Sequence, residues 1–396
     1  MGSQTRSQKI GLSLSGGGSR AVAFHLGCMR ALNELGVLGR VQVISTVSGG
    51  SVIGALYAAK DQPFSDFEAE VRRFLEAGLV RSGILTALTT PEGLKAVSCF
   101  ALVGSLSLLA FAGKCIARPM LRLLPVKQHT KCPTNSWNSI PRFASRTTIL
   151  MRALDTEYFQ GIRLRDLPLT RPHLIVNAAE LRTGSAFYFS PCESGSWRYG
   201  RIKNNDVALA RAVMISAAYP IFLPAIDWRA EFVSKDGRIF TERVVLSDGG
   251  VYDNLGLAPL WPDRDPAISL NVEQIDAIIC CRAGYGLRQE PASQFFVGRL
   301  KESFSTVHER AQNAGLKRLF DLKNSGILND VVLPFLGQDD SRLREKPDDL
   351  VIRDEVEGYP TNFSAMPGQW IEKISKRGEQ LTKSVIAEHS PHLVGK

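Results

Sequence analysis

The amino-acid sequence predicts an α/β fold in which a mostly parallel β-sheet carries helices on both faces. Short apolar segments alternate with segments of helical periodicity through the first half of the chain, which is typical of parallel sheets with crossover helices. A later segment, "DAIICC", is apolar without interruption after its aspartate, as expected of a strand that is covered on both faces. With 396 residues, 44% of them hydrophobic, the chain can build a sizeable core.

The first elements follow directly from this alternation. A strand is expected over residues 9–15, where "KIGLSLS" ends in a run of glycines. The helix expected over residues 21–35 has helical periodicity and stops before Gly36, because glycine is favoured just past helix C-termini. A second strand over residues 41–47 and a second helix over residues 51–59 repeat the pattern.

The remaining elements are spaced more widely along the chain. Strands are expected at residues 173–179, 244–247 and 276–282, a helical insertion at about 80–150, one or two surface helices at 293–324 and a polar loop at 337–359. We therefore expect one α/β domain over residues 9–283, interrupted by the insertion. A helical extension and a tail over residues 284–396 follow it.

The cysteine pattern indicates a reducing compartment. The chain has seven cysteines, an odd number, and none of them is in a C-x-x-C pair or another metal-binding spacing. We therefore expect neither a disulfide framework nor a bound metal. The N-terminal sequence "MGSQTRSQK" lacks the apolar region of a secretory signal, so we expect a cytoplasmic location.

The positive charge is concentrated in one segment. The net charge is +9, and residues 93–154 contain nine Lys and Arg but no Asp or Glu. Within them, Ala96–Gly113 is uncharged and would form a helix of about 27 Å. It is either a buried core helix or a membrane helix, lying on the surface or spanning. We favour contact of residues 95–152 with an anionic membrane and expect no nucleic-acid partner, because a binding motif is missing.

A glycine-rich turn joins the first strand to the first helix. Gly16, Gly17 and Gly18 would expose backbone N–H groups at a helix N-terminus, where negative charge is favoured. The turn could bind a dinucleotide, form an oxyanion hole or serve only as a tight connection. Dinucleotide binding also needs an acidic residue at the end of the second strand, but that strand ends in "STVSGG".

The second strand leads into a candidate nucleophile elbow, a sharp strand–Ser–helix turn. Ser48 and Ser51 each match one glycine of the G-x-S-x-G pattern, and Thr46 stands where the first glycine of the Ser48 frame belongs. Ser48 directly follows the strand, whereas Ser51 lies about one turn into the helix. We therefore expect Ser48 to be the nucleophile.

A serine nucleophile needs a base, and Asp248 is the candidate. It stands at the end of the apolar strand "VVLS" and precedes two glycines. Aspartate in this setting is often only a turn former, but a carboxylate in a partly desolvated site can act as a general base. His308 and His389 lie in charged, helix-like sequence, and we expect neither to take the proton.

Several ordered motifs resemble the patatin-like phospholipase family. The glycine loop "GGGSR", the elbow "STVSGG" and "DGG" occur in the order and settings of that family. The segments "ELRTGSAFYFS" and "ARAVMISAAYPIFLPAI" are similar to its bacterial members. The resemblance covers roughly residues 9–283. It implies a three-layer α/β/α fold and a Ser–Asp dyad that needs no histidine, metal or organic cofactor.

Carried over residue by residue, the resemblance makes Ser48 the nucleophile and Asp248 the general base. It also implies that Gly16, Gly17 and Gly18 form the oxyanion hole, with Arg20 beside it as an electrostatic or structural support. Two positions depart from the family pattern, Thr46 in the elbow and Ala21 after the loop. Thr46 crowds the contact between strand and helix.

These observations predict a serine acyl hydrolase acting on fatty-acyl esters of membrane phospholipids or related lipids. The alternative is a weakly active or inactive membrane-associated scaffold in which Thr46 marks a decayed site.

Overall fold

The computed structural model describes residues 8–102, 104–105, 143–220, 222–286 and 293–394. Its strands join into a single sheet in the order β10-β9-β1-β2-β3-β4-β5-β6-β7-β8. The strands are β1 (Ile10–Leu14), β2 (Val41–Thr46), β3 (His173–Glu180), β4 (Ser185–Phe189), β5 (Gly195–Ser196), β6 (Gly200–Ile202), β7 (Ile226–Val233), β8 (Ile239–Asp248), β9 (Ala277–Cys281) and β10 (Asp330–Val332).

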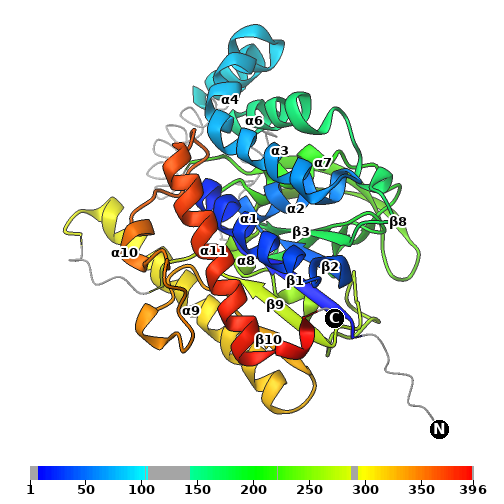
Figure 1. Cartoon of the computed structure of the whole chain (residues 1–396). Coiled ribbons are helices and arrows are strands. Elements are labelled where there is room, and N and C mark those ends of the chain that lie inside the picture. Colours follow the sequence, from blue (N-terminus) through cyan, green and yellow to red (C-terminus); the bar gives the residue numbers. More distant parts are fainter. Residues whose placement is uncertain (1–7, 103, 106–142, 221, 287–292, 395–396) are drawn as a thin grey trace.

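Helices cover this sheet on both faces (Figure 1). They are α1 (Gly18–Glu34), α2 (Gly49–Ala59), α3 (Phe64–Ala77), α4 (Leu79–Thr89), α6 (Arg146–Leu154), α7 (Leu209–Ser216), α8 (Gly250–Asp253), α9 (Phe296–Asn324), α10 (Arg353–Val356) and α11 (Gly368–His389). Residues 91–102 form a further helical segment.

The sheet has a parallel and an antiparallel half. Strands β10, β9, β1, β2 and β3 are parallel neighbours, as the sequence predicts for the α/β core. Strands β4 to β8 pair in antiparallel fashion, and β8 returns to pair with β3. The predicted mostly parallel sheet is therefore confirmed in its core and extended by an antiparallel meander.

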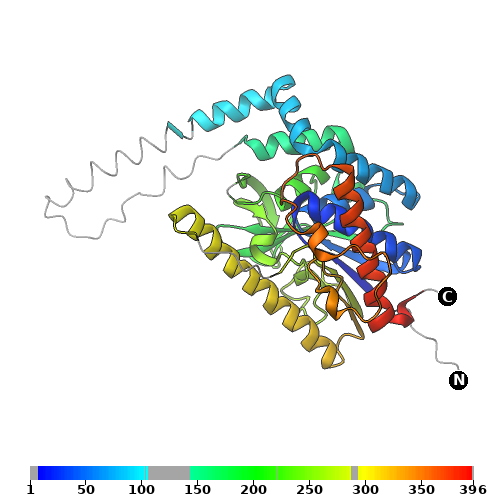
Figure 2. The ribbon, with the colours of Figure 1, turned by 60° about the vertical axis from the view of Figure 1, so that its left-hand side comes forward.

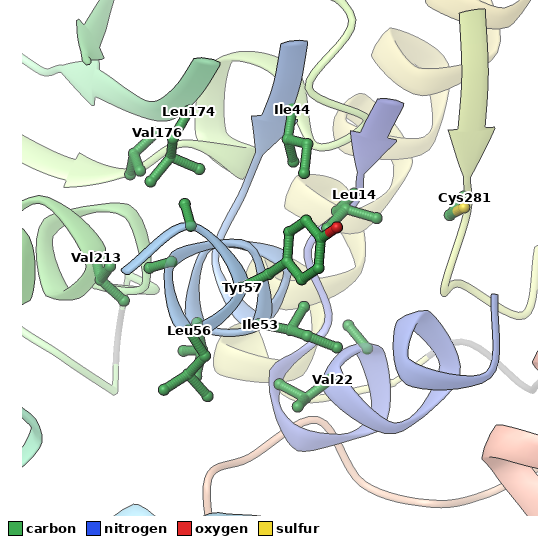
Figure 3. Packing of buried hydrophobic residues seen from close by; sticks show 14 of the residues in the cluster. Leu14, Val22, Ile44, Ile53, Leu56, Tyr57, Leu174, Val176, Val213 and Cys281 are labelled. Atoms are coloured by element: carbon green, nitrogen blue, oxygen red, sulfur yellow. The ribbon is translucent and has the colours of Figure 1, made fainter. Parts of the chain in front are cut away.

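Alternate residues of the central strands face two different apolar layers. Ile44 belongs to the cluster that packs against α1, α2, α7 and α11, whereas its neighbour Val43 belongs to the cluster that includes residues of α9. Figure 3 shows Ile53 and Leu56 of α2 in the first layer, with Leu174 of β3 among the labelled strand residues. Both faces are thus buried, which confirms the three-layer α/β/α arrangement.

Most predicted elements are present, with differences at their ends. The first helix begins at Gly18 instead of residue 21, and its N-cap is Gly17, with a φ of 149°. β8 begins at Ile239 instead of residue 244. The first half of β8 forms a hairpin with β7, and its residues are exposed or partly exposed. It therefore lacks the continuous apolar pattern that marks a buried strand.

The chain beyond residue 283 packs onto the same body. β10 extends the sheet beside β9, and α11 lies across α1 (Figure 1). Gly27 of α1 and Gly378 of α11 allow this close approach, because a Cβ atom at either position would overlap backbone atoms of the other helix. The predicted C-terminal extension is therefore part of the core packing.

The predicted helical insertion begins with α4 and ends with α6. The uncharged segment Ala96–Gly113 lies partly outside the described residues. Its described part is helical, and Val97 and Phe100 there are exposed. Within the described ranges, no helix combines the length and apolarity that crossing a membrane requires.

Candidate active site

The glycine loop after β1 is built from backbone conformations that favour glycine. Gly17 and Gly18 have φ values of 149° and 59°, in the region that side chains rarely adopt. The Gly16 N–H donates to the Asn254 carbonyl over 3.0 Å. Within the described residues, the N–H groups of Gly17 and Gly18, unlike that of Gly16, donate to no backbone carbonyl of another segment. They therefore stand at the N-terminus of α1 with their donors available.

Two glycines at the start of α2 let this helix touch the glycine loop. A Cβ atom at Gly49 would overlap the carbonyl oxygen of Gly18, and one at Gly50 would overlap the carbonyl oxygen of Leu14. Larger residues would push α2 away from β1. The pair of glycines after the candidate nucleophile thus brings the loop and the elbow together.

Ser48 occupies the turn between β2 and α2. Its φ of 51° and ψ of −118° are unfavourable for a residue with a side chain, and such strain is concentrated at functional turns. A Cβ atom at Gly16 would lie 3.2 Å from the Cβ of Ser48, so the serine stands directly beside the glycine loop. Only 7% of Ser48 is exposed.

Ser51, the competing candidate, lies in the interior of the protein. It is fully buried in α2, and its hydroxyl donates to Thr46 Oγ1 at 3.0 Å and lies 2.8 Å from Ser216 Oγ. Its hydrogen-bonding capacity is therefore used within the core. This placement favours the frame in which Ser48 is the reactive serine.

Asp248 reaches the same region through β8. Thr46 of β2 pairs with Val176 of β3, and Asp248 pairs with Ala178 of β3. Because β4 occupies the opposite edge of β3 at both positions, β2 and β8 share one edge and approach each other end to end. The last residue of β8 is thus brought to the turn at Ser48, from the antiparallel direction.

The Asp248 carboxyl group is almost completely buried, with 2% of the residue exposed. Burial raises its pKa from 3.8 to about 7, against the opposing effects of the Gly250 N–H and the Ser48 hydroxyl. The Gly250 N–H donates to Oδ1 over 2.7 Å, whereas Oδ2 has no hydrogen-bond partner within the described residues. One carboxyl oxygen is thus anchored, and the other remains available for a proton.

Arg20 lies beside the glycine loop but is directed at structural partners. Its Nε donates to the Ala283 carbonyl over 3.1 Å, and its guanidinium stacks on the Tyr285 ring with 4.5 Å between the guanidinium carbon and the ring centroid. The arrangement ties the start of α1 to the chain that follows β9.

Three further residues border this region: Ser216 and Asn254, to which the sequence patterns assigned no role, and His308, which was considered from the sequence and not expected to take the proton. Ser216, at the end of α7, accepts a hydrogen bond from the Ser48 N–H over 3.0 Å. Asn254 holds Gly16 through its carbonyl. Ser216 lies inside the quoted segment "ARAVMISAAYPIFLPAI", so the motif marked its neighbourhood, but only the fold brings its hydroxyl to Ser48.

His308 is the third of these residues, and it comes from α9. Burial lowers its pKa, which the neighbouring Glu309 and a hydrogen bond with the Gly250 backbone oppose. Its ring stacks on Phe304, which in turn meets Tyr219 edge to face. Within the described residues it has no hydrogen bond to Ser48 or Asp248, and it meets the loop after Asp248 through the Gly250 backbone.

The chain is similar to a known protein family. A family model described as patatin-like phospholipase matches residues 12–261, which is more than half of the chain and includes the glycine loop, the elbow and Asp248. The search of curated proteins found no match.

Solved structures with a similar fold were also found. VipD from Legionella pneumophila shares 14% identity with a TM-score of 0.41, over 97% of this chain and 67% of VipD. Human GIVD cytosolic phospholipase A2 shares 12% identity with a TM-score of 0.45, over 96% of this chain and 58% of the human chain. The same enzyme in complex with methyl gamma-linolenyl fluorophosphonate gives a TM-score of 0.44 at 12% identity, over 96% and 58% of the two chains.

Proposed function

Because this chain belongs to the patatin-like phospholipase family, we propose that it is a serine acyl hydrolase that cleaves fatty-acyl esters of membrane phospholipids or related lipids. One observation carries the proposal. The strained serine turn after β2 and the buried carboxyl group at the end of β8 meet on one edge of β3. A serine beside an available carboxylate oxygen is the minimum that acyl transfer needs.

In the proposed reaction, Ser48 Oγ attacks the acyl carbonyl carbon while Asp248 accepts the hydroxyl proton. The tetrahedral intermediate then collapses, the bond to the alcohol breaks, and protonated Asp248 returns the proton to the leaving oxygen. In the second half, Asp248 takes a proton from water, and the resulting hydroxide attacks the acyl-serine. Collapse releases the fatty acid and returns the proton to Ser48.

The proposed oxyanion hole consists of the N–H groups of Gly17 and Gly18. The oxyanion that forms in each step needs preorganised donors, and these two amides are available at the N-terminus of α1. The amide of Gly16 is already bonded to Asn254, so Gly16 serves the hole through its small size beside Ser48. We assign Arg20 a structural role in holding this loop.

The proposed membrane contact combines two exposed apolar surfaces. The helical segment before residue 103 exposes Leu94, Val97 and Phe100, and the start of α9 exposes Phe295 and Phe296. Figure 2 shows both segments on the same side of the molecule, at the left of the view. Basic residues between positions 93 and 154 would favour an anionic lipid surface.

A fluorophosphonate probe tests the proposal, because it bonds covalently only to an activated serine. We expect an adduct on Ser48 in the wild type and in Ser51→Ala, mapped by mass spectrometry, and none in Ser48→Ala. An adduct on Ser51 would assign the other frame. A folded wild-type protein that forms no adduct and hydrolyses no phospholipid in mixed micelles would instead support the inactive scaffold.

A further inference from the structure

The C-terminal end of α7 touches both members of the proposed dyad, and this inference rests on the proposed function. The Ser216 hydroxyl accepts the N–H of Ser48 over 3.0 Å, and the Ser216 carbonyl accepts the N–H of Gly249 over 3.2 Å. Two residues on, the Ala218 carbonyl accepts the N–H of Asp248 over 3.2 Å. We propose that Ser216 is a positioning residue that holds the Ser48 turn in register with Asp248.

The Ser216 hydroxyl is itself oriented by a chain of buried hydroxyl groups. Ser51 donates to Thr46 Oγ1 over 3.0 Å, and Thr46 donates to the Ile175 carbonyl over 3.2 Å. Because the proton of Ser51 is used there, the proton of Ser216 points at Ser51 Oγ, 2.8 Å away. The lone pairs of Ser216 Oγ are then left for the amide of Ser48.

In this arrangement, Thr46 and Ser51 help to orient the turn at Ser48. Each hydroxyl in this series donates one hydrogen bond and accepts one. All the hydrogen bonds therefore point in the same direction, from the Ser48 amide towards the Ile175 carbonyl. Such fully satisfied buried networks specify a single geometry. The threonine that departs from the family pattern is therefore a member of the network that orients the turn.

The turn at Ser48 needs this support because its backbone is strained. A φ of 51° in a residue with a side chain persists only when the surroundings impose it. Without the Ser216 oxygen, the buried amide of Ser48 would lose its acceptor, and a buried donor without a partner destabilises the geometry that leaves it so. The turn could then relax, and a displacement of about 1 Å lowers catalytic rates about 100-fold.

The test compares three substitutions. Ser216→Ala removes the acceptor, and Ser216→Cys keeps the shape of the side chain but offers only a weak acceptor. Ser190→Ala is the matched control, because it removes an equally buried hydroxyl that bonds to the Glu193 carbonyl and Asn271 instead of to the Ser48 turn. The readouts are the rate of fluorophosphonate labelling, kcat and KM on a phospholipid in mixed micelles, and hydrogen exchange of the Ser48 amide.

We expect Ser216→Ala to lower the labelling rate and kcat about 10- to 100-fold while KM stays within about two-fold of the wild type. Ser216→Cys should fall between it and the wild type, and it keeps the test decisive if the alanine variant does not fold. The Ser48 amide should exchange faster in both variants, because it has lost its hydrogen-bond acceptor. Ser190→Ala should match the wild type in all three readouts.

The outcomes separate the two proposals. If the wild type is labelled on Ser48 but the Ser216 variants react and exchange at wild-type rates, the positioning role is wrong and the hydrolase stands. If the wild type is neither labelled nor active, the proposed function is wrong. The exchange rate of the Ser48 amide then decides by itself whether Ser216 holds the turn.

Discussion

The methyl group of Thr46 occupies the space that a side chain at position 54 would need. A Cβ atom built at Gly54 would overlap Thr46 Cγ2, and both residues lie where β2 packs against α2. The threonine that replaces a glycine of the elbow is thus accommodated by a glycine eight positions later. This pairing explains how the crowded contact expected from the sequence is relieved.

The first prediction concerns this pair. Gly54→Ala should destabilise the protein by about 1–3 kcal/mol through overpacking, measured by urea unfolding. Thr46→Ser removes the methyl group and keeps the hydroxyl, so it should rescue Gly54→Ala and give a coupling energy of about 1 kcal/mol or more. Gly315→Ala in α9 is the control, because its Cβ would make only ordinary contacts. Strict additivity of the first two changes would refute the pairing.

The second prediction concerns the base. Asp248→Asn keeps the size of the side chain and the oxygen that accepts the Gly250 N–H, but it cannot take a proton. We expect turnover of a phospholipid substrate to fall by about 100- to 10,000-fold with the cooperative unfolding transition retained. Asp276→Asn, a matched change at the residue just before the N-terminal end of β9, should remain active. Near-full activity of Asp248→Asn would end the dyad proposal.

The third prediction follows from the raised pKa of Asp248. Since the base must be ionised, kcat/KM should rise with pH through a midpoint of about 7. A profile that is flat between pH 5 and 8 would contradict this assignment.

The raised pKa of Asp248 also makes the stability of the folded protein depend on pH. The unfolded carboxyl ionises near 3.8, whereas the folded one stays protonated until about pH 7. The folded form therefore binds more protons in this window, and Asp248 lowers the stability as the pH rises from about 4 through 7. Asp248→Asn removes this effect, so the difference in Tm between the variant and the wild type should shift in favour of the variant from pH 4.5 to pH 8.

The fourth prediction concerns the membrane surface. Phe296→Ser at the start of α9 should weaken sedimentation with phosphatidylglycerol vesicles several-fold, because a largely exposed aromatic ring no longer enters the lipid. Binding of the wild type should also weaken with salt, since screening acts on surface charges. Leu169→Ser removes a fully exposed leucine in the segment before β3 and should leave binding unchanged. Equal losses in the two variants would argue against this surface.

The amino-acid sequence by itself determined the α/β core and the identity of the candidate dyad. The strands β1, β2, β3 and β9 were predictable because short, mainly apolar runs with turn residues near their ends are local signals. Ser48 and Asp248 stood out as candidates because each lies at the end of an apolar run and is followed by two glycines.

The tertiary structure decided how these residues meet. Asp248 arrives on an antiparallel strand that shares an edge of β3 with β2, and no local pattern encodes the direction of that approach. Ser216 reaches Ser48 across 168 positions of sequence, and Gly54 makes room for Thr46 only once α2 lies on β2. These features depend on packing between distant segments, whereas periodicity and turn preferences report only on neighbours along the chain.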